Sequence, residues 1–387
     1  MKIEQLICSP AAGWIPRQND LAGLAPQFVL AFGGRRLLED PAYYRQLRAR
    51  YPLARLVLSS TSGEITGTEI TDDQLSVTAV ALEHSRIACA SRTISRPQDS
   101  HALGCALAGE LSGPELVHVF IVADGQLTNG AELARGLGEH LPAGVMLTGG
   151  LAGDGTRFEK TVVGLDEAPV SGRVVALAFY GSRFKSACGS AGGWAPFGPE
   201  RVVTRAESNR LYELDGRSAL ALYKQYLGDQ AAALPSSALR FPLCVSPADG
   251  SPNVVRTILS IDEAAQSMTF AGDIPRGARG RFMRASYEDL LDGAAQASEQ
   301  ARGLEPGLIL CVSCVGRRLV LGQRTEEETE VVREILGPGA ALTGFYSYGE
   351  LAPASRDSAC QLHNQTMTVT VISETRGDAG QTRGEAA

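Results

Sequence analysis

The sequence has no long apolar run. No stretch reaches the roughly 18 uninterrupted apolar residues that a membrane-spanning helix needs, and the N-terminal segment lacks the apolar core of a secretory signal peptide. Long runs of lysine and arginine are also missing, and the net charge is −7, from 36 basic and 43 acidic residues. We therefore expect a cytoplasmic protein that binds neither membranes nor nucleic acids.

Several catalytic and cofactor motifs are missing as well. The sequence has no CxxCH haem-attachment motif, and neither Gly-x-Gly-x-x-Gly nor the P-loop pattern follows a predicted strand. The sequence YSYG at 346–349 resembles half of a nucleophile elbow, but Phe345 stands where the first glycine belongs. We expect a protein that is not an enzyme. The alternative is an enzyme of unrecognised type, a hydrolase or a thiol-dependent catalyst that uses Cys314.

The sequence does contain an internal repeat with three copies. Each copy has an apolar strand, a polar loop, an amphipathic helix, a second strand of small and apolar residues, and a glycine loop that ends in an acid. The opening strands are FVLAF, HVFIV and LILCV. Phe28 and Glu64 are separated by 36 positions, as are His118 and Asp154. This shared order and spacing indicate an internal duplication.

Local signals define the helices within these copies. Asp40 followed by Pro41 is typical of a helix start, and Asn129 with Glu132, like Thr325 with Glu328, has the spacing of a capping box. A strand, a helix and a second strand of this length form a parallel βαβ unit. The segments between the copies alternate in the manner of antiparallel strands. We therefore expect an α/β fold with repeated strand-helix-strand units in mixed sheets.

Composition divides the chain into two tandem α/β domains. Residues 194–206 are rich in proline and glycine and mark the boundary segment. The N-terminal domain is expected over residues 1–193 and the C-terminal domain over residues 207–374. The polar tail, residues 375–387, is expected to be disordered.

The motifs, taken in order, resemble those of the FIST family over residues 25–373. The first half carries SSTSGEI, ADGQLTNG and GGLAGDGTRF, and the second half carries GDIPRGARGRFM, CVSCVGRR, GFYSYGE and HNQTMTV. The resemblance implies a FIST N-terminal and a FIST C-terminal domain. It also implies an intracellular sensory protein that acts with a histidine kinase or a cyclic-dinucleotide enzyme, and a homodimer is compatible with it.

One branch of this family, the NosP-type proteins, is associated with haem binding and nitric oxide sensing. Haem is therefore the cofactor that the resemblance offers. The chain departs from the family at its first glycine loop, which often carries a cysteine. Here Ser59, Ser60 and Thr61 occupy that stretch.

The three glycine loops form the candidate ligand site, because ligands of parallel sheets bind beyond the carboxyl ends of the strands. Backbone N–H groups there can hold a carboxylate and the acids can hold an ammonium, which suits an amino-acid-like or other small polar ligand. The alternative is that the glycines only permit tight turns and the acids cap the next segments. The candidate ligand-binding residues are Gly63, Glu64, Asp124, Gly153, Asp154, Arg317, Tyr346, Gly349, Glu350 and Asn364.

Cys314 and His363 are the candidate ligands of haem or a metal. Cys311 and Cys314, with Cys360 and His363, form a Cys₃His set whose spacing is compatible with zinc or an iron–sulfur cluster. His363 lies near the loops and is the best placed of the five histidines to ligate haem iron. The alternatives are buried reduced thiols and a hydrogen-bonded structural histidine, since residues three apart on a strand point to opposite faces.

Overall fold

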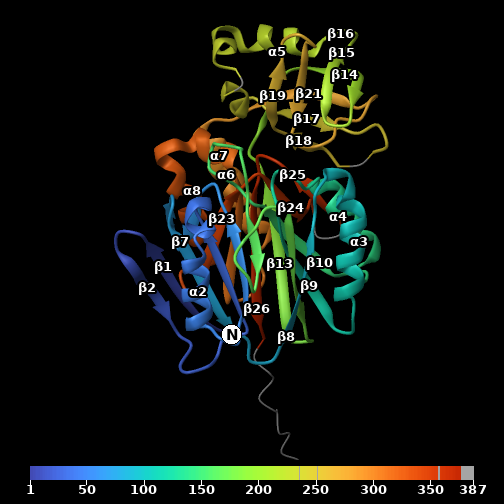
Figure 1. Cartoon of the computed structure of the whole chain (residues 1–387). Coiled ribbons are helices and arrows are strands. Elements are labelled where there is room, and N and C mark those ends of the chain that lie inside the picture. The colour runs from blue at the N-terminus through green and yellow to red at the C-terminus, as the bar shows by residue number, and fades with distance from the viewer. Residues whose placement is uncertain (235, 251, 356–357, 376–387) are drawn as a thin grey trace, which may run out of the picture.

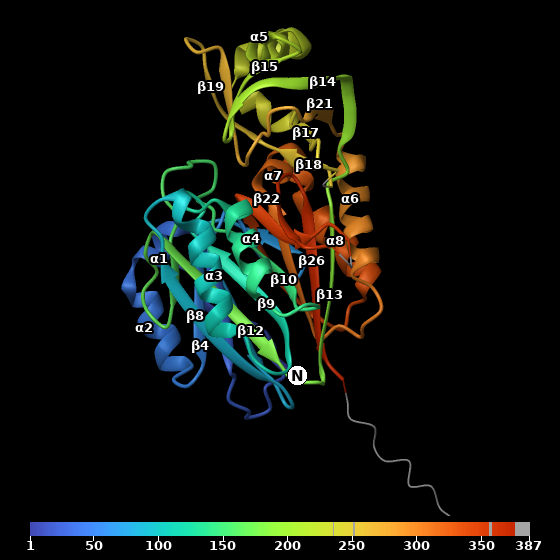
Figure 2. The ribbon, with the colours of Figure 1, turned by 90° about the vertical axis from the view of Figure 1, so that its right-hand side faces the viewer.

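The computed structural model describes residues 1–375 apart from 235, 251, 356 and 357. The rest of the predicted tail lies outside the described residues. The chain forms a larger body, residues 1–194 and 285–375, and a smaller cap, residues 195–284, which sits at one end of the body (Figures 1 and 2). The predicted α/β fold with mixed sheets is confirmed.

Three six-stranded sheets build the body. The first sheet contains, in spatial order, β11 (Val163–Leu165), β4 (Arg55–Ser60), β3 (Phe28–Gly33), β7 (Leu75–Ala81), β1 (Lys2–Ser9) and β2 (Gly13–Asn19). The second contains β25 (Cys360–His363), β24 (Gly349–Pro353), β10 (Met146–Leu151), β9 (Leu116–Ala123), β12 (Arg173–Tyr180) and β8 (Arg86–Thr93). The third contains β13 (Phe184–Ala191), β26 (Met367–Glu374), β22 (Leu308–Cys314), β23 (Ala341–Ser347), β5 (Glu64–Thr66) and β6 (Glu69–Thr71).

The three sheets share one topology. Each has a parallel pair, β3 with β4, β9 with β10, and β22 with β23. The first strand of each pair has a second neighbour on its other side, an antiparallel strand (β7, β12 or β26). That strand in turn pairs with a further antiparallel strand (β1, β8 or β13). The three strand-helix-strand copies predicted from the sequence are therefore confirmed.

The copies exchange strands in a closed cycle. After its glycine loop, the first copy contributes β5 to the third sheet, where it pairs with β23. The third copy contributes β24 to the second sheet, where it pairs with β10. The second copy contributes β11 to the first sheet, where it pairs with β4. The inner faces of all three sheets then share one apolar core, which includes Phe28, Phe120 and Leu310.

Helices cover the outer face of each sheet and bury separate apolar clusters there. They are α1 (Arg35–Glu39) and α2 (Pro41–Arg50) on the first sheet, α3 (Ser100–Leu111) and α4 (Gly130–His140) on the second, and α6 (Tyr287–Gln300), α7 (Val315–Leu321) and α8 (Thr325–Leu336) on the third. Short 3₁₀ turns occur at Pro97–Asp99 and Gly322–Arg324. None of the described helices is long and apolar enough to cross a membrane.

The predicted cap at Asp40 is confirmed, and Asn129 caps α4, but the Asn129 N–H donates to Ser100 and not to Glu132, so only one half of that capping box is present. The Asp40 side chain accepts a hydrogen bond from the Ala42 N–H, and the Asn129 side chain accepts bonds from the two N–H groups that follow position 130. The capping box at Thr325 is wrong, because α8 begins at Thr325 itself and Glu328 turns into the protein. The Glu328 carboxylate pairs with the buried Arg317 and does not reach back to the start of the helix.

The cap is inserted between β13 and α6. Its eight-stranded sheet surrounds its own apolar core. The predicted boundary segment, residues 194–206, forms most of β14, which carries the chain from the body into the cap. The cap elements are β14 (Ala195–Glu207), β15 (Arg210–Leu214), β16 (Arg217–Ser218), α5 (Ala219–Leu227), the 3₁₀ turns Gly228–Ala233 and Ser236–Arg240, β17 (Leu243–Ser246), β18 (Val254–Arg256), β19 (Ile258–Asp262), β20 (Ser267–Phe270) and β21 (Arg279–Arg284).

Candidate functional site

The three glycine loops meet at the end of the body that faces the cap. We call this meeting point the hub; it consists of residues 60–64, 151–157 and 346–350. The backbone N–H of Ser62 donates to Tyr346 O, and that of Tyr346 donates to Gly63 O, both at 2.8 Å. The N–H of Gly153 donates to Ser60 O at 3.0 Å. The loops of three distant repeats are thus held to one another by backbone hydrogen bonds.

Two of the three loop acids are locked in equivalent ways. The Thr61 hydroxyl donates to Glu64 and the Ser347 hydroxyl donates to Glu350, each at 2.6 Å and each from three residues upstream. Thr366 donates to Glu350 through both its N–H and its hydroxyl. Both carboxyl groups are buried, and this burial raises their pKa values to about 8, although the hydrogen-bond donors act in the opposite direction.

The third acid, Asp154, is held by arginines. Its carboxylate accepts hydrogen bonds from Arg35 Nε at 3.0 Å and from Arg157 Nε at 2.8 Å, and its side chain is fully buried. Arg35 belongs to a Gly-Arg-Arg-Leu sequence, residues 34–37, that occurs again at residues 316–319 in the third repeat. The carboxylates of all three acids therefore accept hydrogen bonds from protein groups. This supports a role in shaping the loops more than direct contact with a ligand ammonium.

The glycine of the second loop is required by close packing. A Cβ at Gly153 would lie 2.3 Å from Ser62 Oγ and 2.7 Å from Ser62 N. We expect Gly153→Ala to lower the free energy of unfolding by about 1–3 kcal/mol, the usual cost of overpacking. Gly138→Ala is the matched control, because a Cβ there meets no atom within 4 Å and alanine favours the helix by about 1 kcal/mol. Urea unfolding measures both, and equal stability of Gly153→Ala and wild type would contradict the close contact.

Asp124 and Gly63 also have defined surroundings. The Asp124 carboxylate accepts hydrogen bonds from the N–H groups of Gln126 and Leu127, both at 2.8 Å, so it shapes the turn after β9. Gly63 has a φ of +135°, and a Cβ there would lie 2.6 Å from the Arg318 guanidinium. Both residues therefore build loops, as the structural alternative expected.

Arg317, one of the candidate ligand-binding residues, lies in α7. Its side chain is fully buried, and its Nε donates to Glu328 at 2.6 Å. The Ser313 hydroxyl at 3.1 Å and the Tyr346 hydroxyl at 2.9 Å donate to the same carboxylate, and Arg317 also donates to Leu290 O. Arg317 and Tyr346 thus belong to one buried network between the third sheet and its helices.

The candidate metal and haem ligands lie apart. Among the described residues, no three of Cys311, Cys314, Cys360 and His363 bring their donor atoms together. Cys311 packs in the cluster on the third sheet, whereas Cys360 packs against the cluster on the second. His363 Nε2 donates to Ala352 O at 3.0 Å, and burial lowers its pKa to about 4. These residues do not fit a haem ligated by His363.

Asn364 differs from the other candidates, because its amide has no partner. Its side chain is buried, and neither amide atom makes a hydrogen bond within the described part of the chain. Gly349 lies beside it, with a Cβ position 3.5 Å from Asn364 Nδ2. Arg256 of the cap reaches the same region and donates to Leu362 O at 2.9 Å. The Asn364 amide, close to where the cap meets the body, could therefore hydrogen-bond to a ligand.

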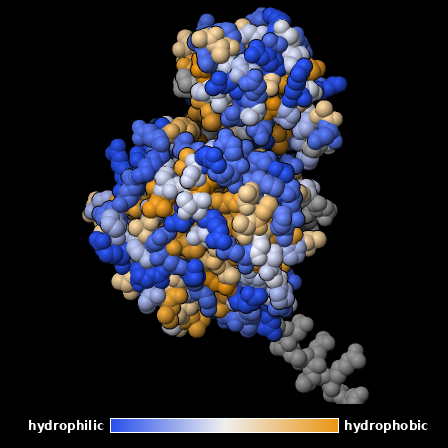
Figure 3. Space-filling view, turned by 45° about the vertical axis from the view of Figure 1, so that its right-hand side comes forward, coloured by the Kyte–Doolittle hydropathy of each residue, from blue (hydrophilic) through white to orange (hydrophobic). Residues whose placement is uncertain are grey.

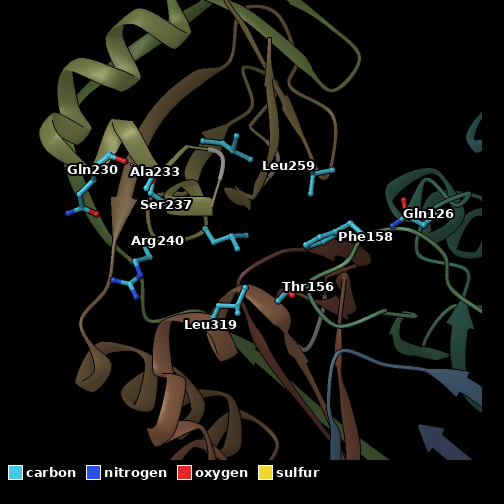
Figure 4. A pocket seen from close by; sticks show the side chains of 11 residues that line it. Gln126, Thr156, Phe158, Gln230, Ala233, Ser237, Arg240, Leu259 and Leu319 are labelled. Carbon is cyan, nitrogen blue, oxygen red and sulfur yellow. Dashed lines mark hydrogen bonds between the residues drawn. The ribbon is translucent and has the colours of Figure 1, made fainter. Parts of the chain in front are cut away.

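A cavity of about 750 Å³ separates the cap from the hub. Figure 3 shows apolar surface at the junction between the two, and Figure 4 shows side chains that enter the cavity from both sides. The body supplies Gln126, Thr156, Phe158 and Leu319, and the cap supplies Gln230, Ala233, Ser237, Leu239, Arg240, Ile258 and Leu259.

Two further cavities adjoin this one. A cavity of about 580 Å³ shares Gln126, Phe158 and Leu259 with it and adds the carboxylates of Glu132 and Asp273. Another, of about 540 Å³, shares Thr156 and Leu319 and is lined by the first glycine loop. Ligand-sized space thus surrounds the hub on the side of the cap, at the strand ends where the sequence placed the site.

The cap residues of this cleft were missed by the sequence analysis. Leu239, Arg240, Ile258 and Leu259 come from a 3₁₀ turn and from β19, and no motif marks them. Their role depends on the fold of the whole chain, which places the inserted cap over the hub. In the sequence, Ile258 and Leu259 are adjacent apolar residues in RTILSID, a segment that is typical of an ordinary strand and gives no sign of a ligand site.

Comparison with known families identifies two successive domains in the chain. The FIST N domain model matches residues 27–217 and the FIST C domain model matches residues 219–353, so the two meet inside the cap. A search of curated proteins found no match. FIST domains are generally sensory domains of signal transduction that bind small ligands. The chain therefore belongs to the FIST family, with a FIST N domain followed by a FIST C domain.

Proposed function

We propose that this protein is a sensor that binds a small ligand between the cap and the hub and reports it to a signalling partner. The observation that carries the proposal is the cavity of about 750 Å³ with walls from both parts of the chain. Ligand pockets commonly have about this volume and commonly lie where two structural units meet. A ligand in this position contacts both walls at once, so its binding favours one arrangement of the cap.

The lining favours a ligand with an apolar part and a negatively charged group. Phe158, Leu259 and Leu319 offer apolar contact, and Gln126 and Thr156 offer hydrogen bonds. Arg240 lines the same cavity and provides a cation for a carboxylate. In the adjoining cavity Glu132 and Asp273 provide anions for an ammonium. An amino-acid-like ligand matches this combination, with Arg240 in the role that the hub N–H groups were expected to have.

The connection between cap and body supplies the means of signalling. The chain crosses only at residues 192–195 and 284–287, and Gly193 there has a φ of +72°. A short crossing of this kind acts as a hinge. The Arg256 bond to Leu362 O and a bond from Gln365 Nε2 to Leu239 O hold the present arrangement. We infer that a ligand shifts the cap, and that a histidine kinase or a cyclic-dinucleotide enzyme reads the shift.

A non-catalytic role has more support than catalysis by Cys314. This thiol is buried, and its burial raises its pKa, which disfavours the nucleophilic thiolate. The haem form of the sensor, with nitric oxide as the signal, has less support than the small-ligand form because the hydrogen bond of His363 to Ala352 O occupies Nε2.

A thermal-shift screen of the full chain tests the proposal. The panel contains the twenty amino acids, short-chain carboxylic acids and haemin. Leu259→Trp fills the cavity, and Val202→Trp is the matched control, because the two residues lie on cap strands, 44% and 43% exposed, and Val202 does not line the cavity. A ligand present at 100 times its Kd should stabilise wild type and Val202→Trp by about 2.7 kcal/mol, and Leu259→Trp should lose this stabilisation.

The outcomes separate the alternatives. A compound that stabilises Leu259→Trp as strongly as wild type binds elsewhere, and this would overturn the cleft as the site. Stabilisation by haemin alone, with a Soret band lost in His363→Ala, would replace the small-ligand sensor by the haem sensor. No stabilisation by any compound in the panel would count against the amino-acid-like ligand.

A further inference from the structure

Helices α3 and α4 pack closely against each other on the outer face of the second sheet. Glycines make this contact possible: a Cβ at Gly136 would lie 2.2 Å from His101 O, and a Cβ at Gly104 would lie 2.6 Å from Leu133 O. Leu103 and Leu137 are buried in the same interface. The backbones of α3 and α4 are therefore in direct contact, and this contact fixes the positions of neighbouring side chains on the two helices relative to one another.

Three side chains with metal-binding atoms lie beside this contact. His101 and Cys105 are one turn apart on α3, so they share a face, and Glu139 faces them from α4. His101 Nε2 is 2.8 Å from Glu139 Oε2, and Cys105 Sγ is 3.8 Å from His101 Nδ1. One donor atom from each residue can be chosen so that all three lie within 4.8 Å of one another. His101 and Cys105 are half-buried and Glu139 is exposed, so the group is open to solvent.

We propose that His101, Cys105 and Glu139 bind a divalent zinc-type ion between α3 and α4. In a tetrahedral zinc site, bonds of about 2.0 Å to nitrogen and about 2.3 Å to sulfur place the donors about 3.3–3.6 Å apart. An ion binds one ring nitrogen of His101: Nδ1 lies 3.8 Å from Cys105 Sγ, close to the ideal separation, whereas Glu139 Oε2 now contacts the other nitrogen, Nε2, at 2.8 Å. The exposed Glu139 side chain must therefore move toward Nδ1 to complete the site, within a group whose chosen donors already lie within 4.8 Å of one another. The thiolate excludes magnesium and calcium, which take oxygen ligands, and favours zinc.

The surrounding charges fit an ion at this place. Arg135 donates to Glu139 Oε1 at 2.9 Å and to Glu132 Oε2 at 2.6 Å, so it orients the carboxylate and leaves Oε2 on the side of His101. Arg135 and Glu132 neutralise each other. The Cys105 thiolate and the Glu139 carboxylate then balance the two charges of the ion, while the neutral His101 ring completes three protein ligands. The fourth position stays open for water or for a group from another molecule.

Cobalt titration of the full chain tests this site directly. Protein stripped with a chelator is titrated with Co²⁺, whose thiolate complexes absorb in the near-ultraviolet, and Zn²⁺ is then added as competitor. We expect one ion per chain, with a charge-transfer band that Zn²⁺ removes. Cys105→Ser should abolish the band, and His101→Ala and Glu139→Gln should each weaken binding by at least about 10-fold.

Two control variants keep the test specific. Cys244→Ser removes another half-buried thiol, on cap strand β17, and His140→Ala removes the histidine at the end of α4. Both should bind Co²⁺ as wild type does, and circular dichroism confirms that every variant is folded. A band that survives in Cys105→Ser, or a wild-type chain that binds no Co²⁺ at millimolar concentration, would overturn the proposal.

Discussion

Replacement of Arg317 by methionine is expected to lower the free energy of unfolding by about 3–5 kcal/mol. The substitution removes the only cation that contacts Glu328 within the described structure and leaves that carboxylate fully buried. The hydroxyls of Ser313 and Tyr346 still donate to it, but they do not neutralise its charge. Urea unfolding followed by circular dichroism measures the loss.

Arg36→Met is the matched control. Arg36 is the second arginine of the first Gly-Arg-Arg-Leu sequence and is exposed, so its replacement should change stability by at most about 0.5 kcal/mol. A double variant, Arg317→Met with Glu328→Leu, should recover much of the loss, because no buried charge remains. If the double variant is less stable than Arg317→Met alone, packing and not the unpaired charge explains the effect.

Stability should fall as the pH rises from about 6.5 to 8, and the hub acids Glu64 and Glu350 are the expected cause. Below about 6.5 the buried His118 and His363, whose pKa values are lowered by burial, act in the opposite direction. Burial raises their pKa values from 4.5 to about 8, so between these values the folded state holds protons that the unfolded state has released. Such a group stabilises the fold fully below the unfolded pKa and loses this contribution as the pH passes the folded pKa. Each acid contributes a slope of up to about 1.4 kcal/mol per pH unit.

The amide variants Glu64→Gln and Glu350→Gln test this origin, since glutamine is neutral at every pH used. Each should flatten the dependence of unfolding free energy on pH, and the double variant should flatten it most. Glu305→Gln, at an exposed position, should leave the slope as in wild type. A slope that persists in the double variant would show that other groups release the protons.

The sequence predicts most of the secondary structure because its signals are local. The apolar runs FVLAF, HVFIV and LILCV form the three buried parallel strands, and the caps at Asp40 and Asn129 begin their helices. The short helices α1 and α7, which contain the Arg-Arg-Leu of the two Gly-Arg-Arg-Leu sequences, are not predicted, because five to seven residues give no periodicity. The role of Glu328 differs from the predicted cap because its buried partner Arg317 lies outside α8, 11 positions earlier, and no local signal marks the pair.

The convergence of the three glycine loops could also be predicted, but the lining of the cavity beside them could not. Parallel strands place their carboxyl ends at one edge, so the convergence of Gly63, Gly153 and Gly349 follows from the repeats. The strand exchange that locks these loops pairs residues hundreds of positions apart, such as Gly150 with Glu350, and no local pattern specifies it. The same holds for Leu259, whose place over the hub depends on the inserted cap.

The strand cycle also has a consequence for biosynthesis. Strand β10 is complete at residue 151, but its outer neighbour, β24, begins only at residue 349. A nascent chain therefore carries an unpaired edge on its second sheet until nearly all of it has left the ribosome. Exposed edges of this kind promote association between chains, and pairings over such a distance form slowly. The second sheet is complete only when β24 of the last repeat has paired with β10 of the second repeat. Premature termination therefore leaves an exposed strand edge and a species prone to aggregate.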